Sequence, residues 1–169
     1  MELRTTALAL AGLALISCAA PRPRARTSSA VGKPFALTAP DLEGREVDVG
    51  AATGTVRVVD FWATWCEPCK DAMPVLDRMA RDLGPAGVRV YGVSIDESRA
   101  PIAAFLRARP VTFPILWDEG AVRLSRLDVS FMPVTVIVDR RGTIRYVHQG
   151  WDPSRAAEER REVEALLKE

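Results

Sequence analysis

The chain has 169 residues, of which 48% are hydrophobic and 27% are charged. That balance fits one globular domain with a short additional segment and argues against bulk disorder or a polytopic membrane protein. A formal net charge of +1 offers no strongly basic surface of the kind that nucleic-acid binding requires. We therefore expect a single domain without a nucleic-acid partner.

The first 17 residues have the pattern of an export signal. Arg4 precedes an apolar run over 7–16 that is too short to span a bilayer, which needs roughly 20 residues. The run ends in Leu15-Ile16-Ser17-Cys18, which resembles the lipobox of bacterial lipoproteins. That resemblance implies cleavage before Cys18 and lipidation of Cys18. The alternative is an ordinary secretory signal with an incidental cysteine, and either interpretation places the protein outside the cytoplasm, in the periplasm or on the outer face of the cytoplasmic membrane.

Residues 18–33 have almost nothing to bury. Prolines and like charges dominate this segment and favour an extended, solvated chain. We expect residues 1–17 to be a lipoprotein signal peptide, 18–33 a lipid-anchored flexible tether, and 34–169 the folded domain.

Strand-like and helix-like segments alternate from residue 35 onward, which predicts an α/β domain with a central sheet. The expected elements are a hairpin of 35–37 with 46–49, a buried strand over 55–62, a helix over 68–83 kinked by Pro74, a strand over 88–95, a helix over 100–107, an apolar segment over 113–117, a helix over 121–127, a hairpin of 134–139 with 143–148, and a helix over 153–168. The last helix is expected to bury Ala157, Val163, Leu166 and Leu167.

Two cysteines three residues apart, Cys66 and Cys69, stand at the start of a predicted helix. Such a pair can close a small disulfide ring and reopen it. A zinc site would need about four cysteine or histidine ligands, and the chain has one histidine, His148. A structural disulfide would constrain little of the unfolded chain because its loop is so small. The spacing therefore favours redox chemistry, with no metal and no cofactor.

The neighbouring residues resemble a known family. The segment from Val59 to Lys70, Val-Asp-Phe-Trp-Ala-Thr-Trp-Cys-Glu-Pro-Cys-Lys, with Pro74 beyond it and Met132-Pro133-Val134-Thr135 downstream, is similar to thioredoxin. The Glu-Pro dipeptide, the hairpin, the helix over 100–107 and the export signal resemble more specifically the TlpA/ResA-like branch of bacterial extracytoplasmic thiol-disulfide oxidoreductases. The resemblance implies a thioredoxin fold, an α/β fold with a central mixed sheet flanked by helices, an N-terminal hairpin, and an extra helix inserted after the second core strand.

Catalytic roles are expected for both cysteines and one acid. Cys66, at the helix N-terminus, is the expected nucleophile because free amide groups and the helix dipole stabilise a thiolate. Cys69 would resolve the mixed disulfide. Asp60, in an apolar strand, should have a raised pKa and take the proton of Cys69, as the matching position does in thioredoxin. The alternative is a carboxylate that solvent reaches.

The resemblance to the ResA-like branch is incomplete at its acidic positions. Its members carry a Glu three residues after the second cysteine, where this chain has Ala72. Glu97 matches a second acidic position of that branch and is a candidate acid or base, with a solvated loop acid as the alternative.

The resemblance also implies the residues that contact substrate. Pro133 resembles the cis-proline that faces the disulfide in thioredoxin folds, and the backbone beside Met132 would pair with an extended substrate segment. Trp65, Glu67 and Pro68 complete the expected substrate-binding set. Trp65 would shield the sulfur atoms, unless it is a core tryptophan.

The expected function is that of a membrane-tethered disulfide reductase, a monomer that acts on protein dithiol or disulfide substrates. The resemblance suggests apocytochrome c as a substrate and a membrane electron donor of the thiol-disulfide interchange type as a partner. A thiol peroxidase of the same fold is an alternative, although its Pro-x-x-x-Thr-x-x-Cys pattern is missing. A Sco-like copper carrier is disfavoured by the Cys-x-x-Cys spacing and the single histidine. A non-catalytic lipoprotein that serves as a binding module remains the alternative from another class.

Overall fold

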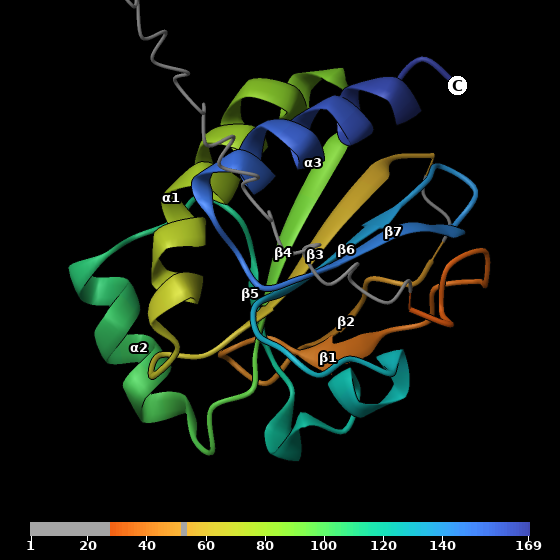
Figure 1. Ribbon diagram of the computed structural model, residues 1–169. Helices are drawn as coiled ribbons and strands as arrows, with labels where there is room; N and C mark the ends of the chain where they lie inside the picture. The colour runs from red at the N-terminus through yellow and green to blue at the C-terminus, as the bar shows by residue number, and fades with distance from the viewer. Residues whose placement is uncertain (1–27, 52–53) are drawn as a thin grey trace, which may run out of the picture.

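A computed structural model describes residues 28–51 and 54–169, so Cys18, the expected signal and most of the expected tether lie outside the described residues. Figure 1 shows the central sheet, whose strand order is β5-β4-β3-β6-β7. The strands are β3 (Val56–Trp62), β4 (Val88–Ser94), β5 (Ile115–Trp117), β6 (Val134–Val138) and β7 (Ile144–Gln149). The pairs β3–β4 and β4–β5 are parallel, whereas β3–β6 and β6–β7 are antiparallel. The sheet is therefore mixed, as predicted.

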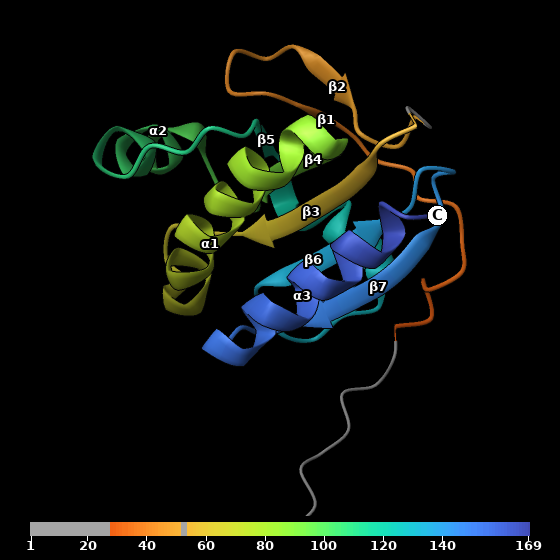
Figure 2. The ribbon, with the colours of Figure 1, turned by 90° about the horizontal axis from the view of Figure 1, so that it is seen from above.

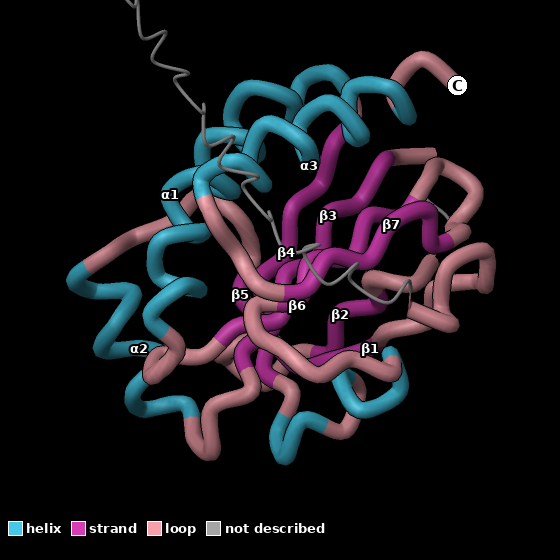
Figure 3. Tube along the Cα trace, in the orientation of Figure 1, coloured by secondary structure: helices cyan, strands magenta, loops and turns pink. Residues whose placement is uncertain are grey.

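The three α-helices in the described part of the chain pack on one face of this sheet (Figures 1 and 2). They are α1 (Glu67–Leu83), α2 (Arg99–Ala108) and α3 (Pro153–Leu166). The hairpin of β1 (Thr38–Pro40) and β2 (Glu46–Asp48) and the 3₁₀ turns η2 (Glu119–Ala121) and η3 (Leu124–Leu127) belong to the other side, and Figure 3 separates these elements by type. The position of α2 confirms the predicted helix after the second core strand. No helix in the described part of the chain is long and apolar enough to cross a membrane.

Strands β3 and β6 form the centre of the core. Every residue of both strands is buried, because neighbouring strands flank them and both faces of the sheet are covered. Three polar side chains are buried with them: Arg57, Asp60 and Thr135. Arg57 donates hydrogen bonds to the backbone carbonyl groups of Val49 at 2.7 Å and Ala51 at 2.6 Å. The Asp60 side chain accepts one hydrogen bond, from the Thr135 hydroxyl group.

Helix α1 covers the predicted residues and begins one residue earlier, at Glu67. Pro68 lies in its first turn, where a proline does not remove an intrahelical hydrogen bond. Pro74 lies inside the helix, and the helix continues beyond it to Leu83. Its buried face includes Cys69, Met73 and Leu76, at the spacing of three and four residues that a helix brings to one side.

The first strand of the predicted hairpin is wrong in position. The structure forms β1 at Thr38–Pro40, three residues later than the expected 35–37, with Thr38 paired to Asp48. Phe35 and Leu37 instead bury their side chains in the core, with exposed fractions of 5% and 4%. Their hydrophobic side chains therefore gain more from packing under the sheet than from a place in the hairpin.

The predicted helix over 121–127 is also wrong. In its place the chain makes two separate 3₁₀ turns, η2 and η3. Gly120 and Ala121 have positive φ values of 68° and 54°, which no α-helix allows. The buried Asp118 carboxylate accepts hydrogen bonds from the backbone N–H groups of Arg123 and Leu124 and fixes this irregular path. A side chain thus supplies the partners that a helical ladder would otherwise provide.

Part of the segment assigned to the tether packs on the domain. The Ser28 hydroxyl donates to the backbone oxygen of Leu127 at 2.6 Å, and Ala30 is buried. The N–H of Gly32 donates to the backbone oxygen of Ile144 at 2.8 Å. The packed chain therefore begins before Pro34, the boundary expected from composition.

Candidate active site

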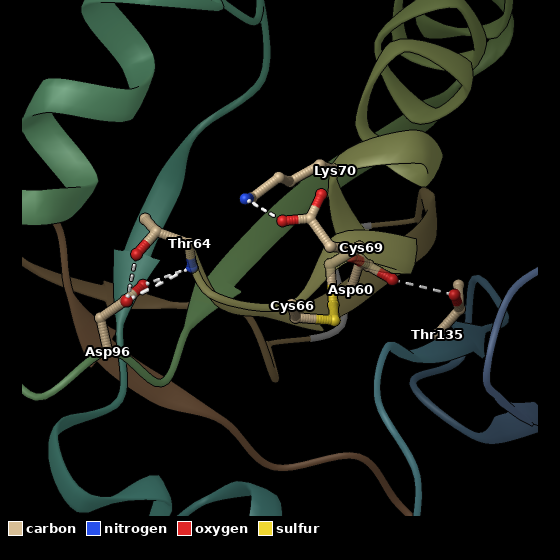
Figure 4. The surroundings of a disulfide bond; sticks show 8 residues. Asp60, Thr64, Cys66, Cys69, Lys70, Asp96 and Thr135 are labelled. Carbon is tan, nitrogen blue, oxygen red and sulfur yellow. Dashed lines mark hydrogen bonds and ion pairs between the residues drawn. A yellow bond between two sulfur atoms is a disulfide. The ribbon is translucent and has the colours of Figure 1, made fainter.

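Cys66 and Cys69 form a disulfide bond where the sheet meets α1 (Figure 4). Strand β3 ends at Trp62, and Cys66 is the N-cap residue of α1 with an extended backbone. The Cα atoms of the two cysteines are 5.3 Å apart. The strand and the helix start thus place the two sulfur atoms at bonding distance.

The two sulfur-bearing residues differ in exposure. Cys66 is 6% exposed, whereas Cys69 is fully buried. No side chain caps the N-terminus of α1. Its free amide groups and the positive end of the helix dipole are available to a thiolate on Cys66. Geometry therefore favours Cys66 as the accessible sulfur and Cys69 as the enclosed one.

Two exposed aromatic side chains lie next to the cysteine pair or to the Met132–Pro133 segment along the chain. Trp65 is 63% exposed, so it is not the core tryptophan that the sequence left as an alternative; Trp62 takes that place and is fully buried. Phe131, which the sequence analysis overlooked, is 71% exposed. It directly precedes Met132, and the Met132–Pro133 peptide bond is cis. Trp65, the residue before Cys66, therefore offers apolar surface to a partner beside the disulfide, and Phe131 offers it beside the cis peptide bond.

Glu67 and Pro68, between the two cysteines, are exposed. The Lys70 ammonium group donates to Glu67 at 2.7 Å, and this hydrogen bond lowers the pKa of the Glu67 carboxyl group. Glu67 is therefore a surface anion held by its neighbour one turn along the helix. It can contact a partner, and it is not placed to take a proton from the buried Cys69.

Asp60 is the buried acid of the site. It lies on β3, two residues after Val58 and two before Trp62, so all three side chains point to the same side of the sheet. That side also buries Cys69. The Thr135 hydroxyl donates to Asp60 Oδ1 at 3.0 Å, as Figure 4 shows. Oδ2 has no hydrogen-bond partner within the described residues. Burial raises the pKa of Asp60 well above its ordinary value, the nearby Glu159 carboxyl group adds to this rise, and the Thr135 hydrogen bond opposes it.

Glu97 does not reach into the site, whereas its neighbour does. Glu97 is exposed in the loop after β4. Asp96 is 2% exposed, and its carboxylate accepts from the Thr64 N–H at 3.0 Å, the Thr64 hydroxyl at 2.6 Å and the Ser94 hydroxyl at 2.7 Å. Asp96 thus fixes the loop that leads into Cys66. The signal was present in the sequence, since Asp96 directly follows the predicted strand over 88–95.

We expect Asp96→Ala to destabilise the oxidised protein by about 2–3 kcal/mol, because it leaves the buried donors of Thr64 and Ser94 without their acceptor. Denaturant unfolding followed by tryptophan fluorescence measures this loss. Glu97→Ala, one residue away and exposed, is the matched control and should stay within about 0.5 kcal/mol of the wild type. Equal unfolding midpoints for the two variants would contradict the role given to Asp96.

A second buried acid, Glu159 on α3, was missed. Ala157 was expected on the buried face of this helix, but Ala157 is exposed and Glu159 is 1% exposed. Burial raises the pKa of Glu159 to about 7. The spacing could have revealed it, because Glu159 lies four residues before the buried Val163 and seven before Leu166.

In the described ranges, 28–51 and 54–169, no group of three or more His, Cys, Asp and Glu side chains could hold a metal ion. His148 instead pairs with Glu162, its Nε2 atom 2.6 Å from Oε2. This lone histidine therefore belongs to a side-chain contact between β7 and α3.

Comparison with known proteins gives consistent results. Residues 31–147 match the AhpC/TSA family. The thiol-disulfide oxidoreductase ResA of Geobacillus kaustophilus is 30% identical over 128 residues, which cover 74% of this chain and 72% of that protein. ResA of Bacillus subtilis is 29% identical over 110 residues, and the match covers 65% of this chain but only 62% of that protein. A Chlorobium tepidum structure described as a thiol:disulfide interchange protein DsbE aligns with a TM-score of 0.76 and 27% identity, over 81% of this chain and 96% of that one.

The fold and the disulfide at the start of α1 define a thioredoxin-like protein with a Cys-x-x-Cys site. The chain belongs to the AhpC/TSA family and to the ResA-like group of thiol-disulfide oxidoreductases.

Proposed function

We propose that this protein is a thiol-disulfide oxidoreductase that exchanges electrons with protein substrates through Cys66 and Cys69, in the direction of disulfide reduction. The observation that carries the proposal is the disulfide at the N-terminus of α1, with one sulfur-bearing residue near the surface and the other enclosed. The similarity to ResA proteins supports the same reaction class.

The reaction begins from the reduced protein. The Cys66 thiolate attacks one sulfur atom of a substrate disulfide, the substrate S–S bond breaks, and the first substrate thiolate leaves and takes a proton. Cys69 then loses its proton to the Asp60 carboxylate and attacks the Cys66 sulfur atom. The mixed disulfide breaks and releases the second substrate thiolate. Two electrons have passed to the substrate, and the protein holds the Cys66–Cys69 disulfide seen in the structure.

Substrate contact is assigned to the surface around the disulfide. Trp65 and the cis Met132–Pro133 segment would hold an extended stretch of the substrate protein, with Glu67 and Pro68 at its edge. Apocytochrome c is the substrate that the ResA-like resemblance suggests. A membrane protein of the thiol-disulfide interchange type would return the protein to its dithiol form.

An insulin-reduction assay with dithiothreitol tests this function. The wild type should accelerate insulin precipitation over dithiothreitol alone, and Cys66→Ser should not. A wild type that matches dithiothreitol alone would favour a non-catalytic binding module. Peroxide consumption without insulin reduction would favour the peroxidase alternative.

The proposed location is outside the cytoplasm, with a lipid on Cys18 as the membrane anchor. The Leu15-Ile16-Ser17-Cys18 sequence motivates this part of the proposal.

We expect Cys18→Ala to abolish lipid attachment, so that the protein leaves the membrane fraction or keeps its signal. Cell fractionation and mass spectrometry of the mature N-terminus measure this. Cys66→Ala is the matched control, because it removes a cysteine without touching the processing site. An unmodified N-terminus at another position in the wild type would contradict lipidation.

A further inference from the structure

A row of polar side chains crosses the helix-covered face of the sheet. Asp60 on β3 is in register with Thr135 on β6, and Thr135 is in register with His148 on β7. Side chains directly opposite one another on neighbouring strands point to the same face. The row therefore leads from the redox site toward the edge strand β7.

Helix α3 adds a second carboxyl group to this row. Glu159 is 1% exposed and lies on the same side of α3 as Arg155 and Glu162, which contact His148, the residue in register with Thr135. The side chain of Thr135 lowers the pKa of Glu159. The same hydroxyl donates to Asp60 Oδ1 at 3.0 Å. Thr135 thus donates to one buried acid, Asp60, and lies beside the other, Glu159.

The site cannot readily hold two negative charges. Asp60 Oδ2 and Glu159 Oε1 are buried and have no hydrogen-bond partner within the described residues. Two carboxylates in such surroundings repel each other and lack solvation, so one of them keeps its proton. A hydroxyl group has one proton to donate and lone pairs to accept, so it can donate to the ionised acid while it accepts from the protonated one.

The other charged groups near Glu159 lie on the outer side of the row. His148 on β7 attracts the ionised form of Glu159, as does Arg155 on α3, whereas Glu162 on α3 opposes it. His148 Nε2 is 2.6 Å from Glu162, and Arg155 Nη1 is 3.0 Å from His148 Nδ1. The side chains of His148 and Glu162 are 10% and 16% exposed. Polar groups therefore continue from Glu159 to the protein surface.

We propose that Glu159 is a positioning residue of the redox site and shares one proton with Asp60 through the Thr135 hydroxyl group. The inference rests on the proposed function. Before resolution, the shared proton passes from Asp60 through the Thr135 hydroxyl group to Glu159. Protonated Glu159 then donates to the Thr135 oxygen, and Thr135 donates to ionised Asp60. Asp60 is then ready to take the proton of Cys69.

The proton that Asp60 takes must then leave a fully enclosed site. Glu159 releases its own proton on the His148 side, and the Thr135 hydroxyl turns to donate to the ionised Glu159. Asp60 passes its proton to the Thr135 oxygen as the Thr135 hydrogen moves to Glu159. Asp60 is ionised again, Glu159 is protonated again, and one proton has travelled from Cys69 to the surface.

The test is a pH titration of the full-length protein by infrared absorption of protonated carboxyl groups, with and without reduction of the disulfide. In the wild type we expect two coupled titration steps. In Glu159→Gln we expect one titration step. The step that disappears in Asp60→Asn belongs to Asp60. In Glu159→Gln the Asp60 step should lie at lower pH than in the wild type, because the neighbouring negative charge is gone. Glu164→Gln is the matched control on the same helix. Its carboxylate pairs with Arg160 at 2.9 Å, and both of its titration steps should stay in place.

Kinetics separate proton transfer from a structural role. Thr135→Val removes the bridging hydroxyl group and should slow resolution of the mixed disulfide by roughly tenfold to a hundredfold, toward the lower end of general-base effects. Thr135→Ser restores the hydroxyl and should restore the rate. An Asp60 step at the same pH in Glu159→Gln, Glu164→Gln and the wild type would overturn the inference. The infrared titration does not depend on catalytic turnover. It therefore tests the proton-sharing inference separately from the insulin assay, whose failure would overturn the proposed function.

Discussion

Cys69→Ser will accumulate a mixed disulfide between Cys66 and the substrate, and turnover will fall to the background rate of dithiothreitol. Cys66 is the accessible sulfur at the helix N-terminus, and Cys69 is fully buried behind it. The first attack needs only the Cys66 thiolate, whereas release of the substrate needs the second sulfur atom. Mass spectrometry of the trapped complex after proteolysis identifies the cysteine that carries the substrate.

The reciprocal variant is the control. Cys66→Ser leaves Cys69 as the remaining thiol of the site, and we expect neither turnover nor a trapped complex, because Cys69 has no exposed surface. A complex trapped through Cys69 in that variant would reverse the assignment of nucleophile and resolving cysteine.

Asp60→Asn will slow resolution of the mixed disulfide at neutral pH by about 10²–10⁴-fold, the usual contribution of general-base help. The first attack by Cys66 should keep its rate, because it requires no proton acceptor at Cys69. Stopped-flow measurement of the two half-reactions across pH separates these effects. Unchanged resolution rates would show that another group accepts the proton, and Glu159, the second buried acid, would be the next candidate to test.

The same substitution will change the pH dependence of stability. Burial raises the pKa of Asp60 in the folded state, so the folded protein binds more protons than the unfolded chain above pH about 4. Wild-type stability therefore falls as pH rises from that value through the folded pKa of Asp60. The asparagine variant lacks this loss. Its gain in unfolding free energy over the wild type should therefore be absent at low pH and largest above the folded pKa of Asp60. Denaturant midpoints measured across pH test the sign, and an advantage confined to low pH would contradict it.

The central elements could be predicted from sequence because local pattern and tertiary packing agree there. β6 is a continuous run of β-branched residues, β3 is apolar apart from Arg57 and Asp60, and the structure buries every residue of both. The predictions were wrong where a side chain or a contact with a distant residue determines the backbone conformation. The segment over 121–127 has a helical pattern, yet the buried Asp118 carboxylate holds it in separate turns.

The candidate site was predictable only in part, for the same reason. Cys66, Cys69 and Asp60 follow from spacing and from a charge in an apolar strand. Glu159 comes from a helix almost one hundred residues along the chain, since 99 positions separate it from Asp60. Only the packing of α3 on the sheet brings it to Thr135.

The contacts of Ser28 and Gly32 with the domain bear on how far an anchored protein could search for substrates. Ten peptide steps separate Cys18 from Ser28, compared with fifteen to Lys33. Ten steps span at most about 35 Å, and fifteen about 50 Å. The volume within reach of a fixed point scales with the cube of that length, so docking of residues 28–33 reduces it to about a third. A lipid on Cys18 would therefore hold the disulfide in a thin layer next to the membrane, where its effective concentration for membrane-bound partners is higher.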